Sequence, residues 1–312
     1  MGDSNQRRRG AARAASRAHR PVVDGGRLAA WDVLKAVRVD DAYANLALPQ
    51  ALANHGLGGR DAAFATELVS GTLRGRGTYD AVIDACLTAP RLEAKVRDVL
   101  RLGAHQLLAM RVPDHAAIST SVDLARSKVG TGPTGLVNAV LRKVAARDLE
   151  SWVAQVAPDA ATDPTGHLSV ATSHPEWVVD ELRRALVGHG RACDELPALL
   201  AADTEPPTVT LVARPGLVEV GELEEHGAHP TGRSPYALTW PGGDLSSVPA
   251  LATGRAGVQD EGSQRVAIAL AQAPMSGPDV RWLDLCAGPG GKSALLAALA
   301  AQRGAKGLAN AR

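Results

Sequence analysis

Apolar residues recur at helical spacing through most of the first half of the chain. Between residues 27 and 147, glycine and proline fall between the periodic stretches rather than inside them. One stretch follows offsets of 0, 3, 4, 7, 11 and 14, which form a single stripe along a helix: Val96, Val99, Leu100, Gly103, Leu107 and Met110. Several such helices joined by short loops predict a helical bundle.

Three further stretches carry helix signals. Residues 137–144 hold an apolar stripe after a segment rich in glycine and proline, and residues 64–73 hold another. Asp61 precedes the second stripe and is expected to be its N-cap. A helix is also expected over 113–124, because proline suits the first turn and the following aspartate suits its positive end.

Composition excludes several classes of protein. The chain has 312 residues, enough for about two domains, and 45% of its residues are hydrophobic. No apolar run approaches the roughly 18 residues of a membrane span, so we expect no membrane association. The three cysteines, Cys86, Cys193 and Cys286, form no CxxC pair, which argues against a disulfide scaffold or a cysteine zinc site. A reducing, cytoplasmic setting fits best, and Cys86 and Cys193 are expected to be small buried apolar residues.

The net charge of +1 hides a basic N-terminus. Residues 1–22 contain six arginines against a single acidic residue, Asp3, and almost no large apolar side chain. Such a segment cannot bury enough surface to offset its ordering entropy, so it is expected to be a disordered basic tail. Whether it contacts phosphate or is simply solvated stays open.

The middle of the chain predicts a bridge between domains. Residues 148–175 hold three prolines among small polar residues, a composition typical of a domain boundary. Amphipathic spacing predicts a helix over 177–186, and a second short helix is expected over 194–202. Strands are expected at 208–212 and 236–240. The segment therefore predicts a linker and a small α+β subdomain.

Two tryptophans in this bridge, Trp177 and Trp240, have two possible roles. They could stack on nucleic-acid bases or pack in a core. Core packing is favoured for both.

An apolar strand near the C-terminus enters a glycine-rich turn that feeds an Ala/Leu helix, over residues 280–301. Such a turn lets backbone approach a ligand and aims free N–H groups at it, which suits a nucleotide-like cofactor. A Walker A loop would need glycine at the position of Cys286, and a dinucleotide fingerprint would need glycine at the position of Ser293. Both alternatives are therefore disfavoured.

The first half also resembles a known module. The segments DAAFATELVSGTLRGRGTYD (61–80), VRDVLRLGAHQLLAMRVPDHAAISTSVDLAR (96–126) and GLVNAVLRKVAAR (135–147) resemble the NusB-type helical module that opens bacterial rRNA cytosine methyltransferases of the Sun/RsmB family. The resemblance covers nearly all of 27–147 and implies a bundle that contacts RNA.

Candidate phosphate ligands lie on the expected helices, although a solvated charged face is the favoured interpretation. These candidates are Arg74, Arg76, Arg142, Lys143 and Arg147. His105 and His115 have no Cys, His or Asp at ligand spacing. Ordinary hydrogen-bonded histidines are therefore expected, and no metal site.

The glycine-rich turn resembles a second family signature. DLCAGPGGK (284–292) resembles motif I of RNA cytosine-C5 methyltransferases, usually DxCAAPGGK, with Gly288 as the departure. GVQDEGSQRVA (257–267) resembles the same family's upstream word and places a helix start at 259–264. The resemblance implies that S-adenosylmethionine is held, chiefly by backbone groups, at Cys286, Ala287, Gly288, Pro289, Gly290, Gly291 and Lys292.

Other family features are missing. The family's nucleophilic cysteine lies in a Pro-Cys word and a second cysteine in a Thr-Cys-Ser word, and no cysteine here has either context. No acidic residue follows Asp284, although Rossmann-like sites place one about 20 residues beyond the turn. The ending 301–312 lacks the expected apolar strand. We therefore expect a truncated chain, with the nucleophile beyond Arg312, that does not methylate RNA alone.

The sequence thus predicts a multidomain protein. It has a disordered tail (1–22), an all-α NusB-like bundle (23–150), a linker with a small α+β subdomain (151–256) and an incomplete Rossmann-like α/β methyltransferase domain (257–312). The implied activity is S-adenosylmethionine-dependent cytosine-C5 methylation of small-subunit rRNA by a monomer. The alternative is a non-catalytic NusB-like RNA-binding protein, and a P-loop NTPase is the third possibility.

Overall fold

The structure, a computed structural model, describes residues 23–88, 91–243, 245–288 and 290–309. It consists of two compact units, one ending at Glu205 and one beginning at Pro206. The expected basic tail, residues 1–22, lies outside the described residues.

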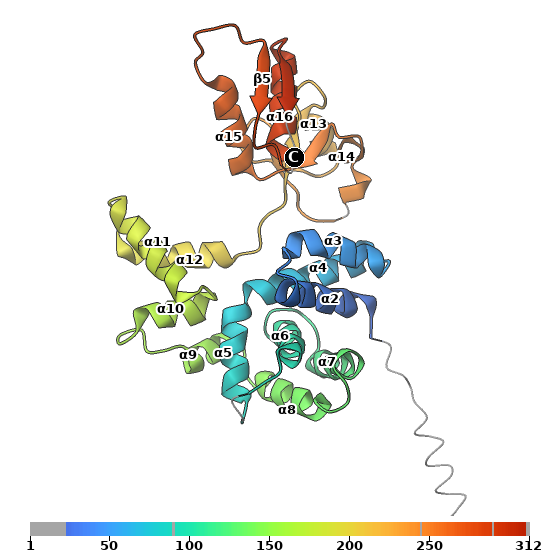
Figure 1. Ribbon diagram of the computed structural model, residues 1–312, viewed down its shortest axis with the longest axis vertical. Helices are drawn as coiled ribbons and strands as arrows, with labels where there is room; N and C mark the ends of the chain where they lie inside the picture. The colour runs from blue at the N-terminus through green and yellow to red at the C-terminus, as the bar shows by residue number, and fades with distance from the viewer. Residues whose placement is uncertain (1–22, 89–90, 244, 289, 310–312) are drawn as a thin grey trace, which may run out of the picture. The chain divides into compact units, whose positions relative to one another are not determined.

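Helix α6 is the centre of the first unit. It packs against α2, α4, α5, α7 and α8 (Figure 1), which confirms the predicted helical bundle. The helices of the bundle are α2 (Gly25–Val39), α3 (Ala44–Asn54), α4 (Gly59–Arg74), α5 (Arg76–Cys86), α6 (Ala94–Leu108), α7 (Asp114–Lys128), α8 (Thr134–Val144) and α9 (Leu149–Val156).

The predicted stripe is buried over its first four positions, whereas Leu107 and Met110 are half-buried and Met110 lies beyond the end of α6. Val99 and Leu100 are fully enclosed in the core. Gly103 allows α8 to approach closely, because a Cβ there would lie 2.6 Å from Leu141 Cδ1. The helix also buries Asp98 and His105 on other faces. A central helix therefore needs polar partners that a single apolar stripe does not predict.

One expected cap is wrong. Asp61 is not the N-cap of α4, because the helix begins earlier and Gly58 occupies the cap. Asp61 lies instead in the first turn, where its carboxylate faces the positive end of the helix dipole.

Contacts with the bundle continue beyond residue 148. Trp152 of α9 lies in the bundle core, and its Nε1 donates to the Val144 carbonyl at 2.8 Å. Helix α10 (Pro164–Thr172) packs on α5, where Thr78 Oγ1 donates to the Val170 carbonyl at 2.5 Å. These contacts explain why the compact unit continues to Glu205 rather than dividing near 150.

The end of this unit corrects two expectations. On α11 (Glu176–Gly188) the buried residue is Val179, and Trp177 is 69% exposed. Two residues along a helix turn about 200° around its axis, so these two side chains point in opposite directions. Cys193 is exposed in the 3-10 turn η1 (Cys193–Glu195), ahead of α12 (Leu196–Thr204), and is not a core residue.

A four-stranded antiparallel sheet forms part of the second unit. Its order is β2-β3-β1-β4. Trp240 follows β3 and packs in the core beside the sheet, as predicted. The elements are β1 (Thr210–Ala213), α13 (Val220–Glu225), β2 (His229–Pro230), β3 (Ala237–Thr239), η2 (Leu245–Ser247), α14 (Pro249–Ala252) and β4 (Ala256–Val258).

Alternate residues of β1 face two different cores. Leu211 and Ala213 pack with the sheet's own cluster, whereas Val212 packs with α15 (Glu261–Gln272) and α16 (Gly291–Gln302). This contact joins the small sheet to the helices that follow it. The small sheet and these helices therefore lie in the same compact unit.

A second strand does follow the glycine-rich turn. β5 (Arg281–Asp284) pairs in parallel with β6 (Lys306–Ala309), with α16 as the connection between them. This corrects the expectation that the ending lacks a strand. The short Lys-Gly-Leu-Ala segment has a weak strand pattern, but the ladder is made by backbone groups, and Lys306 N also donates to the Val280 carbonyl at 3.0 Å.

Candidate functional site: the glycine-rich turn

The glycine-rich turn joins β5 to α16. Gly290 is the N-cap of α16 with φ of 111°, a left-handed conformation that favours glycine. A Cβ at Gly288 would meet nothing within 4 Å, so alanine fits there as it does in the family word. Cys286 is exposed and Ala287 is buried. Of the predicted residues, Gly291 and Lys292 begin α16 and the others lie in the connection before it, with Pro289 outside the described residues.

Asp284 accepts hydrogen bonds from both ends of this turn. Its Oδ1 accepts from the Cys286 backbone N–H at 3.0 Å, and its Oδ2 accepts from Ser293 Oγ at 2.6 Å. Both hydrogen bonds lower the pKa of the Asp284 carboxyl below its ordinary value, and the one from Ser293 has the larger effect. The carboxylate thus stays ionised and fixes the turn near neutral pH.

The start of α16 is open to an anionic group. No side chain caps it, and its first turn contains no acidic residue. The first N–H groups of a helix have no intrahelical partner and carry the positive end of its dipole. Lys292 Nζ donates to Ser263 Oγ at 3.3 Å, which connects the turn to α15.

Gln259 presents an unpartnered amide beside the turn. Its side chain is 7% exposed, and neither Oε1 nor Nε2 has a hydrogen-bond partner among the residues that the structure describes. A Cβ at Gly291 would lie 3.9 Å from Gln259 Cδ. By contrast, Gln264 is fully buried and satisfied, since its Nε2 donates to the carbonyls of Leu211 and Gln259. A buried amide without partners is costly unless a ligand or water pairs with it.

The sequence placed Gln259 at a helix start and assigned it no role in the site. The signal that could have found it is its position in the upstream family word, next to the Asp260 that caps α15.

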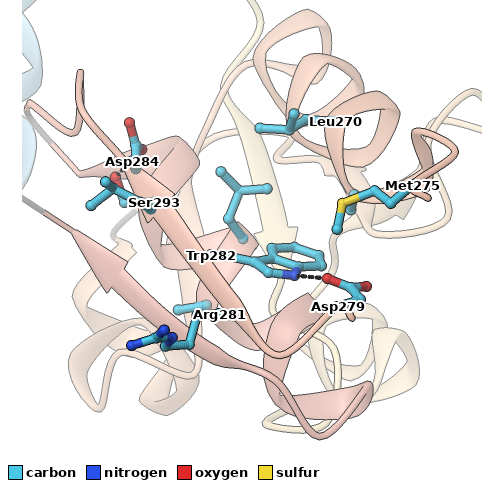
Figure 2. Close-up of a pocket in the computed structure, with 11 residues that line it drawn as sticks. Leu270, Met275, Asp279, Arg281, Trp282, Asp284 and Ser293 are labelled. Carbon is cyan, nitrogen blue, oxygen red and sulfur yellow. Dashed lines mark hydrogen bonds between the residues drawn. The ribbon is translucent and has the colours of Figure 1, made fainter. Parts of the chain in front are cut away.

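A cavity of about 250 Å³ adjoins the turn between α15, β5 and α16. Figure 2 shows the Trp282 ring across its middle, with Nε1 hydrogen-bonded to Asp279, whereas Asp284 and Ser293 lie at the opposite end. The cavity therefore joins an aromatic surface to polar groups of the turn. That combination suits a flat, partly polar ligand.

The cysteines lie in different surroundings. Cys86 is buried in the bundle, and burial raises the pKa of its thiol. Cys193 lies in the first unit and Cys286 in the turn. Within the described ranges, no three His, Cys, Asp or Glu side chains are grouped so that they could hold a metal ion. No helix in the described part of the chain is both long and apolar enough to cross a bilayer.

Most of the candidate cations of the first unit have internal partners. Lys143 Nζ donates to the Cys86 carbonyl at 2.9 Å, and the Arg147 guanidinium lies 5.6 Å from the Trp152 ring centroid. Arg142 Nε donates to Asn138 Oδ1 at 3.3 Å. These contacts favour structural roles.

The two candidate histidines differ in burial. His105 is buried and its Nδ1 lies 2.8 Å from the Tyr79 hydroxyl, which confirms an ordinary hydrogen-bonded histidine. His115 is exposed on α7.

Comparisons with known proteins cover most of the chain. Residues 25–146 match the NusB family. A Mycobacterium tuberculosis (strain H37Rv) protein, Rv1407, whose name describes a methyltransferase, is 50% identical over 92% of this chain and 63% of its own length. A Bacillus subtilis protein named as a ribosomal RNA small subunit methyltransferase B is 31% identical over 88% of this chain and 60% of its own length.

A solved structure shares the fold. The crystal structure of PH0851 matches with a TM-score of 0.62 at 20% identity, over 90% of this chain and 62% of that one. The chain spans about three-fifths of the length of the relatives it matches. A NusB-family domain is thus followed by a segment homologous to proteins named as methyltransferases, among them a ribosomal RNA small subunit methyltransferase B, as the Sun/RsmB resemblance implied.

Proposed function

We propose that this chain supplies the RNA-binding part and the S-adenosylmethionine site of a methyltransferase that acts on cytosine C5 in small-subunit rRNA. The observation that carries the proposal is the glycine-rich turn beside the unpartnered Gln259 amide. The relatives' names support rRNA methylation.

The residues of the turn fit this cofactor. The free N–H groups at the start of α16 suit a carboxylate, and Gln259 offers both a donor and an acceptor. We assign cofactor contacts, chiefly through backbone, to the turn from Cys286 to Lys292, Pro289 included by resemblance. When bound, S-adenosylmethionine supplies an electrophilic methyl group. The chain's own part is to hold and orient it.

We further propose that β5, α16 and β6 are the first βαβ unit of a Rossmann-like domain. The parallel pairing and the glycine-rich turn at the carboxyl end of β5 support this. The outward apolar side chains Leu283 and Leu285 are 62% and 72% exposed. Parallel sheets are normally covered on both faces, so such a face suits further helices.

Cytosine-C5 methylation needs a thiolate that adds to C6 of the base. We assign this role to none of the three cysteines. Cys86 is buried with a raised pKa, Cys193 is in the helical unit, and Cys286 belongs to the cofactor turn. We therefore propose that this chain binds cofactor and RNA as a monomer in the cytoplasm, without a metal, but does not itself transfer the methyl group.

Thermal unfolding and methyl transfer together test this proposal. S-adenosylmethionine should raise the melting temperature of the chain, whereas ATP should not, because the turn is no Walker A loop. Incubation with tritiated S-adenosylmethionine and small-subunit rRNA should give no labelled RNA. Labelling that disappears in Cys286→Ser would show that the cysteine assignment is wrong.

The NusB-family match supports a second candidate, a non-catalytic RNA-binding protein. It predicts RNA protection by the chain at moderate salt and no response to S-adenosylmethionine. Absence of a footprint would remove RNA binding from both candidates.

A further inference from the structure

A polar cavity lies in the helical unit where α2, α4, α5 and α6 meet. It has a volume of about 200 Å³, several times the roughly 30 Å³ that one water occupies. Its polar lining comes from Arg38, Thr72, Arg76, Asp98 and Arg101. We refer to it as the arginine cavity.

A closed network of ion pairs forms one wall. Asp98 is 2% exposed, and it accepts from Arg38 Nε at 2.6 Å and from Arg101 Nη1 at 3.0 Å. Arg101 also donates to Asp80 through two nitrogens, at 2.8 and 2.6 Å. These charges stabilise one another, so Arg101 and Asp98 are committed to the wall.

Arg97 completes the network. It donates to Asp80 at 3.3 Å and to Asp84 at 2.6 Å, so three carboxylates face three guanidiniums. Arg76 lines the same cavity but makes no ion pair or hydrogen bond within the described part of the chain. Arg76 is also exposed to solvent, so its charge is accessible to a ligand and has no carboxylate partner among the described residues.

Thr72 adds an unsatisfied donor. It is fully buried, and its Oγ1 has no hydrogen-bond partner in the described part of the protein. Helical threonines usually donate to the carbonyl four residues earlier. Others do so at 2.7 to 2.8 Å, among them Thr66 to Ala62, Thr120 to Ala116, Thr172 to Leu168 and Thr204 to Leu200. Thr72 lines the cavity instead, and a buried hydroxyl left unpaired costs free energy that a ligand recovers.

We propose that the arginine cavity binds a phosphate group carrying a single negative charge. Arg76 pairs with its charge, and Thr72 Oγ1 donates to one of its oxygens. Arg38 uses only Nε for Asp98, so both of its terminal nitrogens are available as further donors in this part of the structure. Arginine is well suited to phosphate because it donates two parallel hydrogen bonds. The phosphate comes either from an RNA backbone or from free inorganic phosphate, and the RNA source alone rests on the proposed function.

The first arm of the test measures binding of a labelled single-stranded RNA of mixed sequence by fluorescence anisotropy across a salt series. Arg76→Ala should weaken binding about tenfold and reduce the salt slope by about one. Thr72→Val keeps the side-chain shape, removes the unpaired hydroxyl and should weaken binding roughly threefold without loss of folding.

Arg60→Ala is the matched control. Arg60 is an exposed arginine in the first turn of α4, the helix that carries Thr72. The two residues lie roughly 18 Å apart along the helix axis. Replacement of Arg60 removes the same charge and should weaken RNA binding less than about twofold.

The second arm measures thermal stabilisation of the full chain by inorganic phosphate. Stabilisation that is lost in Arg76→Ala and Thr72→Val but kept in Arg60→Ala supports the site. If Arg76→Ala and Thr72→Val change only the stabilisation by inorganic phosphate, free phosphate is the ligand. If they change only the binding of RNA, the ligand is an RNA phosphodiester.

Equal effects of Arg76→Ala and Arg60→Ala, with no effect of Thr72→Val in either arm, would overturn the proposal. A titration with S-adenosylmethionine separates this failure from failure of the proposed function, because none of these variants touches the glycine-rich turn.

Discussion

The bundle core and the βαβ unit use similar apolar residues in opposite ways. On α6, Val99 and Leu100 are fully buried by neighbouring helices of the same unit. On and after β5, Leu283 and Leu285 are mostly exposed. The bundle thus satisfies its own apolar stripes, whereas the βαβ unit presents a face that its own elements do not cover. Stability in this chain should therefore come mainly from the bundle, and the proposed cofactor binding from the turn.

Truncation of one leucine in each region gives the largest expected contrast. Leu100→Ala leaves a cavity in the bundle core and should lower the free energy of unfolding by about 2 to 5 kcal/mol. Leu283→Ala removes an exposed side chain and should change it by less than about 0.5 kcal/mol. Urea unfolding followed by circular dichroism measures both, and equal losses would mean that the two regions are not different.

Substitution of two glycines at the turn distinguishes the effect of backbone strain from the effect of available space. Gly290→Ala must adopt a positive φ and should lower the free energy of unfolding by about 1 to 3 kcal/mol. The same strain should also weaken cofactor binding. Gly288→Ala has open space and no positive φ, so it should cost less than about 0.5 kcal/mol. Thermal melts with and without S-adenosylmethionine test both. A costly Gly288→Ala would contradict the open geometry of the turn.

Alkaline pH should weaken the bundle through Tyr79. Burial raises the pKa of Tyr79 to about 12, above its ordinary value of 10.0. The unfolded chain loses this proton first, so stability from Tyr79 is complete below pH 10 and falls as pH rises toward 12, by about 1.4 kcal/mol per pH unit. Tyr79→Phe should flatten the fall measured by urea unfolding between pH 9.5 and 11. The exposed Tyr43→Phe is the control and should follow the unchanged protein.

The smallest expected effect concerns Asp284. Ser293→Ala removes the main hydrogen bond that lowers the pKa of this carboxyl, so the pKa should rise toward its ordinary value. The stabilising contribution of the ionised form is lost as pH falls through the folded pKa, and the loss should begin at a higher pH in the variant. Carbon-detected NMR titration of the carboxyl measures this, and an unchanged pKa would contradict the assigned hydrogen bond.

Local patterns predicted the elements but not the partners that lie far away in sequence. The stripe through Val96, Val99 and Leu100 identified α6, and the turn identified β5 and α16. The buried Asp98 could not be predicted, because it needs Arg38 from a distant helix. Helical spacing placed Trp177 on the apolar face of α11, yet Val179 is the residue that its neighbours bury.

The glycine-rich turn was predicted from sequence because backbone contacts depend on a few glycines and their spacing. That the Gln259 amide lacks hydrogen-bond partners among the described residues depends on its three-dimensional surroundings, which no local sequence pattern contains. The same holds for Thr72, which resembles any helical threonine in sequence. Family resemblance led to the proposal that the turn holds the cofactor, and the structure added the unpaired amide of Gln259 beside it.

The most direct test of the account is isothermal titration of the chain with S-adenosylmethionine, beside Gln259→Leu. Removal of an unpartnered buried amide should not lower the melting temperature. We predict that the unchanged chain binds the cofactor, that ATP does not bind, and that Gln259→Leu binds S-adenosylmethionine about tenfold more weakly with stability preserved. Undiminished binding by the variant, or no binding by the unchanged chain, would contradict the assignment of the turn and Gln259 as the cofactor site.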